Sequence, residues 1–119
     1  MDDWSNKHTV LIVDDQESVK LALSRMLSRE GFEVLLAEDG DNALDILREK
    51  KVNVMLSSLK MHKMDGLRLL KASKLIKPEV EVILITAHGT IEKAVDAMKD
   101  GAYDFVTKPF KGIIIVNTI

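Results

Sequence analysis

Residues 9–15 read Thr-Val-Leu-Ile-Val-Asp-Asp, a short apolar run that stops at two adjacent acids. The run is rich in β-branched residues and does not alternate between apolar and polar positions, which is typical of a strand buried on both faces. Three later runs share this character, and a fifth strand is expected near the end of the chain. We therefore predict strands over residues 9–13, 34–37, 52–56, 82–85 and 102–107.

The segments between these runs have the period of amphipathic helices. We expect one helix over residues 17–29, a second from a capping turn at 39–41 to about Lys50, a third that ends before Pro78, and a fourth stopped by Asp100-Gly101. The positions expected on the core-facing sides of these helices are Val19, Ala22, Leu23, Met26, Leu27, Ala43, Leu44, Leu47, Leu69, Ala72, Ser73, Ile76, Ile91, Ala94, Val95 and Met98.

Strands that alternate with helices and are apolar throughout belong in a parallel sheet covered on both faces. The sequence thus predicts an open, doubly wound α/β domain with five parallel strands. We expect a single domain over residues 1–119, in which residues 1–8 form an N-terminal extension and residues 111–119 form a short or frayed final helix.

Composition excludes several classes of protein. The chain has 119 residues, a formal net charge of −2 and no cysteine, so a disulfide scaffold, a thiolate zinc site and a cysteine nucleophile are excluded. No apolar run approaches the roughly 20 residues of a membrane span. The slightly acidic balance argues against binding nucleic acid through phosphate contacts. These features predict a soluble cytoplasmic domain that binds neither membrane nor nucleic acid.

Polar residues end several of the predicted strands. Asp14 and Asp15 follow the first strand, Ser57-Ser58 the third, Thr86 the fourth, and Lys108 the fifth. The carboxyl ends of parallel strands share one edge of a sheet, where ligands bind in this class of fold. Paired carboxylates suit a hard cation such as Mg²⁺, and a lysine suits an anionic group. The alternative is that these residues only begin turns, where Asp and Ser are common.

The chain resembles the response-regulator receiver domains of bacterial two-component signalling over essentially its whole length. The resemblance rests on residues 10–15, Leu59-Lys60-Met61 with Met64-Asp65-Gly66, Ile85-Thr86-Ala87, and residues 101–110. The amino-acid sequence after Thr86 and over residues 101–110 is most similar to that of receivers of sigma-54-dependent transcription activators. The resemblance implies a flavodoxin-like strand order of 2-1-3-4-5 and a signalling module rather than an enzyme.

The resemblance also implies roles for individual residues. Asp14 and Asp15 correspond to the acidic pair that holds Mg²⁺, and the backbone carbonyl of Lys60 to a further metal ligand. Thr86 corresponds to the switch hydroxyl, Phe105 to the switch aromatic, and Lys108 to the lysine that pairs with the phosphorylated aspartate. In chain order, the positions with implied roles are Asp14, Asp15, Lys60, Thr86, Phe105 and Lys108.

One position departs from the family pattern. The phosphoacceptor aspartate of the family lies three residues before the methionine of the loop motif, and counting back from Met61 gives Ser58. A serine hydroxyl is scarcely ionised and needs a general base that the family geometry does not supply. We therefore expect Mg²⁺ binding to be weak and signalling to proceed without phosphate, through contacts between proteins.

Several alternatives remain at this point. The chain resembles equally an acceptor-null receiver fragment of a sigma-54-dependent regulator, natural or engineered. A more remote reading is a small hydrolase with Ser58 as nucleophile and His62 or His88 as base, although both histidines read more simply as loop residues. The partners implied by the resemblance are a sensor histidine kinase, an effector domain, or a second copy bound through the face of residues 91–98, 102–107 and 111–119.

Overall fold

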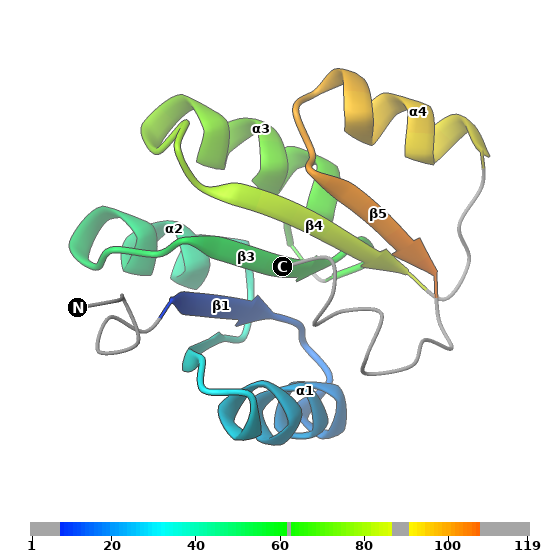
Figure 1. Cartoon of the computed structure of the whole chain (residues 1–119). Helices are drawn as coiled ribbons and strands as arrows, with labels where there is room; N and C mark the ends of the chain where they lie inside the picture. The colour runs from blue at the N-terminus through cyan, green and yellow to red at the C-terminus, as the bar shows by residue number, and fades with distance from the viewer. Residues whose placement is uncertain (1–7, 62, 87–90, 108–119) are drawn as a thin grey trace.

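The computed structural model describes residues 8–61, 63–86 and 91–107. Within them, five strands form one parallel sheet in the order β2-β1-β3-β4-β5, as the resemblance implied (Figure 1). The strands are β1 (Thr9–Val13), β2 (Glu33–Ala37), β3 (Val54–Ser58), β4 (Glu81–Thr86) and β5 (Asp104–Thr107), and the helices are α1 (Glu17–Arg29), α2 (Gly40–Glu49), α3 (Gly66–Ile76) and α4 (Ile91–Lys99).

Helices cover both faces of this sheet, which confirms the predicted fold class. Leu23 and Leu27 of α1 pack with Val10 and Ile12 on one face. The helices α2, α3 and α4 lie on the other face, where Leu11 and its neighbours form a second core (Figure 1). Because successive strand residues point to opposite faces, each residue of a central strand meets one of these cores. This arrangement explains why the central strands are apolar without alternation.

The edge strand β2 is an exception to the expected burial on both faces. Val34 and Leu35 are half-buried, and Leu36 is 39% exposed. The cause is its position at the edge, because β2 pairs only with β1 among the described strands. Apolar composition alone does not distinguish an edge strand from a central one.

The bounds of four strands differ from the prediction, and β4 extends one residue further at each end than the predicted range 82–85. The third strand spans 54–58 rather than 52–56, because Val54 pairs with both Val10 and Glu81 and the ladder continues to the pair of Ser58 with Ile85. The two serines are thus the last residues of the strand and do not follow it. The second strand begins one residue early, and the fifth begins at 104, since Ala102 closes the end of α4 by donating to the Ala97 carbonyl at 2.9 Å.

The helix boundaries agree well with the prediction, but three residues that were predicted to face the core are exposed to solvent. Ala22, Val95 and Met98 were expected to face the core and are exposed, whereas Lys20, Leu70 and Ala97 are buried. Lys20 is only 7% exposed, with its ammonium 3.8 Å from the carboxylate of Glu17. A lysine can bury its aliphatic stem in this way while its charged end stays near an acid.

None of the described helices has the length and apolar character needed to cross a membrane. The predicted N-terminal extension falls almost wholly outside the described residues, and the predicted final helix at 111–119 falls wholly outside them. The extent of the domain over residues 1–119 remains a prediction.

Candidate functional site at the carboxyl edge of the sheet

The acid pair lies directly after β1, at the edge where the strands end. Asp14 is buried, with 4% of its surface exposed, and Asp15 is exposed. One carboxylate oxygen of Asp14, Oδ1, accepts a hydrogen bond from the backbone of Gln16 at 2.9 Å. Gln16 is the residue that precedes α1, and its own side chain caps nothing. The first carboxylate of the pair therefore also organises the turn into the helix.

The third strand brings two buried hydroxyls to the same edge. Ser57 is completely buried, and its Oγ donates to the carbonyl of Ser58 at 3.0 Å. Ser58 is 8% exposed, and its Oγ donates to the carbonyl of Lys60 at 3.1 Å. Ser58 therefore faces the loop that leads to α3, and the hydroxyl is bonded to a backbone group of that loop.

Thr86 completes a row of polar residues across neighbouring strands. It is the last residue of β4, it is buried, and it pairs with Thr107 of β5. Since Ser58 pairs with Ile85, Thr86 lies one residue beyond Ser58 along the edge. The adjacent strands β3 and β4 thus end in Ser58 and Thr86, and Asp14 directly follows the neighbouring strand β1.

The loop between β3 and α3 is closed by backbone contacts at both ends. The amide of Leu59 donates to Ile85 at 2.9 Å, and the amide of Gly66 donates to Leu59 at 2.7 Å. A Cβ on Gly66 would lie 2.5 Å from the Ser58 carbonyl oxygen and 2.9 Å from the Cα of Leu59. Only glycine fits this close approach of two backbones, so the glycine of the loop motif has a steric function.

The rest of the loop is attached to neighbouring helices. Asp65 caps α3 by accepting a hydrogen bond from the amide of Arg68 at 2.9 Å. The ammonium of Lys63 lies 3.8 Å from a carboxylate oxygen of Asp39, which itself caps α2. Lys63 has a φ of 69°, a left-handed conformation that costs energy in any residue with a Cβ.

The remaining predicted site residues are divided between the described and undescribed parts of the chain. The Lys60 carbonyl lies in the loop after β3, and Phe105 lies in β5, half-buried against the core of α2 and α3. Lys108, His62 and His88 lie outside the described residues. The structure therefore brings Asp14, Asp15, Ser58, Lys60 and Thr86 to one edge, which is the part of the prediction that can be located.

The oxygen atoms at this edge suit a hard cation, but they are few. Asp14 and Asp15 supply carboxylates, and Lys60 supplies a backbone carbonyl. Among the described residues there is no group of three or more metal-ligating His, Asp or Glu side chains. Mg²⁺ would therefore be held by two carboxylates and a carbonyl, with water for the rest of its octahedron. That carbonyl already accepts the Ser58 hydroxyl.

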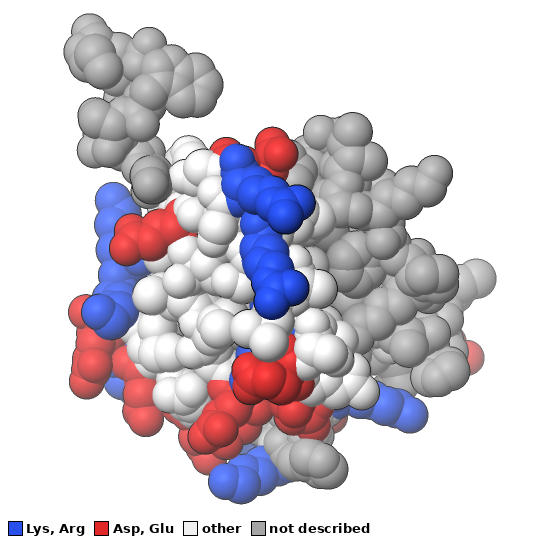
Figure 2. Space-filling model, turned by 90° about the horizontal axis from the view of Figure 1, so that it is seen from below, with Lys and Arg blue, Asp and Glu red and all other residues white. Residues whose placement is uncertain are grey.

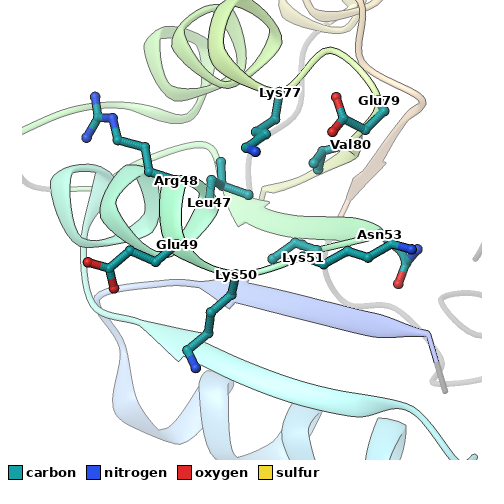
Figure 3. Close-up of a pocket in the computed structure, with 10 residues that line it drawn as sticks. Leu47, Arg48, Glu49, Lys50, Lys51, Asn53, Lys77, Glu79 and Val80 are labelled. Carbon is teal, nitrogen blue, oxygen red and sulfur yellow. The ribbon is translucent and has the colours of Figure 1, made fainter. Parts of the chain in front are cut away.

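Sequence reasoning did not anticipate a hollow at the opposite edge of the sheet. It has a volume of about 360 Å³, and its floor is formed by Leu47, Val52 and Val80. Charged residues surround it, among them Arg48 and Lys50, which extend outward from the hollow in Figure 3. No motif marks these residues, because they belong to the end of α2 and to the turns before β3 and β4 rather than to the carboxyl ends of the strands.

Charge is mixed over the described surface. On the side of the molecule that carries α1, Figure 2 shows basic and acidic side chains interspersed, with neutral side chains between them and acids gathered along one edge. A separate apolar patch lies on α4 and just before β5, where Val95, Met98 and Tyr103 are each about half exposed. We call these three residues the α4–β5 patch.

Comparison with known proteins identifies the class to which this fold and edge belong. Residues 10–119 match the family model of the response regulator receiver domain, so the chain belongs to that family. It is 44% identical over 103 residues to an NtrX-like response regulator of Rickettsia bellii (strain RML369-C), covering 85% of this chain and 22% of that protein.

One further relative by sequence and one solved structure show similar proteins. The DNA-binding transcriptional regulator NtrC of Klebsiella pneumoniae is 42% identical over 99 residues, covering 83% of this chain and 21% of that protein. The solution structure of the beryllofluoride-activated NtrC4 receiver domain dimer superposes with a TM-score of 0.88 at 35% identity, covering 92% of this chain and 91% of that one. The chain spans about a fifth of the length of these curated relatives.

Proposed function

We propose that this receiver domain belongs to a sigma-54-type transcription regulator and signals without aspartyl phosphate, because Ser58 stands where the family has its phosphoacceptor. The observation that carries the proposal is the position of Ser58 as the last residue of β3, next to the acid pair and bonded to the Lys60 carbonyl. Its similarity to NtrX-like and NtrC proteins supports the choice of regulator.

The chemistry of Ser58 supports a loss of phosphoryl transfer. An ionised carboxylate attacks a phosphohistidine directly, whereas a serine hydroxyl must first lose its proton to a base. The Ser58 hydroxyl donates to a backbone carbonyl, which is not a base. The Oδ1 atom of Asp14 accepts a hydrogen bond from the backbone amide of Gln16 at the start of α1, so this oxygen already has a partner. The same reasoning disfavours a hydrolase with Ser58 as nucleophile, and we propose no enzymatic activity.

The other residues of the edge keep their family roles in this proposal. Asp14, Asp15 and the Lys60 carbonyl would hold Mg²⁺ weakly, since one charged ligand is missing. Thr86, Phe105 and Lys108 would form the switch that connects the edge to the outer face of the domain. With no phosphoryl group to bias the switch, its equilibrium would be set by a bound partner.

The α4–β5 patch is the surface that we propose for this partner. Val95, Met98 and Tyr103 expose apolar side chains that were expected in part to lie in the core. A second copy of the domain, an effector domain or a sensor kinase in the cytoplasm would bury them. The related NtrC4 receiver is a dimer in its activated form, which makes a second copy the first partner to test.

Phosphodonor treatment tests the central claim. We expect that a small-molecule phosphodonor with Mg²⁺ adds no phosphoryl group to the wild-type chain, as measured by mass spectrometry of the intact protein. Ser58→Asp should gain one phosphoryl group under the same conditions, and Ser58→Asn should gain none. A stable phosphoryl group on wild-type Ser58 would overturn the proposal.

A further inference from the structure

The hydrogen bond of Ser58 connects the sheet edge to a loop that crosses it. Ser58 is the last residue of β3, and Lys60 lies two residues on, at the start of the loop that ends at Gly66. The Ser58 Oγ lies 3.1 Å from the Lys60 carbonyl oxygen. The donor is largely buried, whereas the side chain of Lys60 is exposed. The bond therefore fixes the direction of one peptide group at the border between core and solvent.

This peptide group would otherwise need another partner. A carbonyl oxygen at the edge of a core requires a donor, a water molecule or a cation, and an unsatisfied one costs free energy. In the function proposed for the carboxyl edge, the Lys60 carbonyl oxygen is one of the atoms that would contact Mg²⁺. The Ser58 hydroxyl offers a proton to the same oxygen from inside the protein, so the oxygen is satisfied without an ion.

The Ser58 bond acts together with other contacts on the first half of the loop, where Leu59 is buried in the core and Met61 packs against it. The end of the loop is well fixed, since Gly66 donates to Leu59 and Met64 packs closely on Gly40. Lys63 contributes only a solvent-exposed ion pair at 3.8 Å to Asp39 and holds a strained φ of 69°. Exposed ion pairs contribute little. Within this part of the loop, the Ser58 hydroxyl orients the Lys60 peptide group by a hydrogen bond to its carbonyl oxygen.

We propose that Ser58 is a positioning residue whose hydroxyl takes the place of a divalent cation at the Lys60 carbonyl, so that the β3–α3 loop keeps one conformation with or without Mg²⁺. The comparison with a cation rests on the proposed function, which places Mg²⁺ at this edge. The loop would then present a constant surface to a partner, whatever the state of the acid pair.

Amide hydrogen exchange of the full chain tests this proposal. The reporter is the amide of Gly66, whose bond to Leu59 closes the loop, and the reference is the amide of Leu59, which is bonded to Ile85 in the sheet. Taking the ratio of the two rates removes changes in global stability. In the wild type we expect this ratio to change by less than about twofold between EDTA and millimolar Mg²⁺, as for a loop that already has its bond.

Variants separate the hydroxyl from other effects. Ser58→Ala should raise the ratio about fivefold, the change expected for one net hydrogen bond, and Ser58→Thr, which keeps a hydroxyl, should restore most of it. Ser73→Ala is the matched control, because Ser73 is likewise a buried serine and its Oγ donates to the Leu69 carbonyl at 2.7 Å within α3. It should leave the ratio at the wild-type value.

Two results would overturn the inference: an unchanged ratio in Ser58→Ala, or a wild-type ratio that falls more than about fivefold when Mg²⁺ is added. Neither result bears on whether wild-type Ser58 accepts a phosphoryl group. Conversely, a phosphoryl group found on Ser58 would overturn the proposed function alone if the exchange ratio rose in Ser58→Ala and stayed constant with Mg²⁺ in the wild type, as expected. The two failures are therefore distinguishable.

Discussion

At the carboxyl edge of the sheet, Asp14, Ser57 and Ser58 are buried and hydrogen-bonded, whereas at the opposite edge charged side chains around an open hollow are exposed to solvent. Asp14, Ser57 and Ser58 each have a defined backbone partner within 3.1 Å. Around the hollow, Arg48 and Lys50 extend outward and are exposed (Figure 3).

The difference shows that a hollow in this domain need not be lined by buried polar groups with specific partners. The hollow has a volume of about 360 Å³, but most charged side chains around it are exposed, and exposed charges contribute little to stability. The carboxyl edge has buried polar groups, which are costly unless every one of them is satisfied. Substitutions at the carboxyl edge should therefore have large and specific effects on the free energy of unfolding, and substitutions around the hollow should have almost none.

The largest effect is expected for Gly66→Ala. The added Cβ would meet the Ser58 carbonyl oxygen and the Leu59 Cα, which are backbone atoms that cannot turn aside. We expect a loss of about 2–3 kcal/mol in the free energy of unfolding, measured by urea denaturation. Gly40→Ala is the control, since its Cβ would meet the side chain of Met64. A flexible side chain can move, so a loss as large as that of Gly66→Ala would contradict the steric argument.

The second effect concerns Ser58→Asp. A third carboxylate beside Asp14 and Asp15 repels them, so in EDTA we expect a loss of about 1–2 kcal/mol in the free energy of unfolding. Millimolar Mg²⁺ should restore this loss by binding the native state. Urea denaturation with and without Mg²⁺ measures both. Ser58→Asn has nearly the same shape without the charge, and Mg²⁺ dependence in that variant would show that the charge of the new side chain is not the cause.

A smaller effect, of opposite sign, is expected at Lys63. Glycine adopts the left-handed φ of 69° without the Cβ penalty, so Lys63→Gly should raise the free energy of unfolding by about 0.5–1 kcal/mol. The lost ion pair with Asp39 is exposed at its lysine end and offsets little of this gain. Lys63→Ala removes the same ion pair but keeps the Cβ. If thermal unfolding showed equal gains for both variants, backbone strain would not be the reason.

The smallest effects on the free energy of unfolding are expected for substitutions around the hollow. Lys50→Ala and Glu79→Ala remove opposite charges from exposed positions around it. Each should change the free energy of unfolding by less than about 0.5 kcal/mol. Urea denaturation of the two variants completes the comparison between the edges. A loss above about 1 kcal/mol in either variant would mean that the hollow carries a structural contact comparable to those of the carboxyl edge.

Much of the fold was predictable because short local sequence patterns identify most strands and helix starts. The apolar run at 9–13 and the capping turn at Asp39 specify a buried strand and a helix start, and both are found as predicted. Errors occurred where the deciding contact comes from elsewhere in the chain. The third strand continues to Ser58 because β1 pairs with it as far as Ser57 and β4 supplies Ile85 as the partner of Ser58. The helix α4 exposes Met98 because its orientation on the sheet is set by packing, not by composition.

The sequence by itself determined the class of fold and the chemistry available at its edge. Periodicity depends on neighbours a few residues apart, and the absence of an acid at position 58 can be read directly. Only the tertiary structure decided what that serine does. The bond from Ser58 to the Lys60 carbonyl and the closure of the loop by Gly66 depend on how β3, β4 and α3 pack together. Such contacts arise from the approach of backbones in space, on which local residue patterns carry no information.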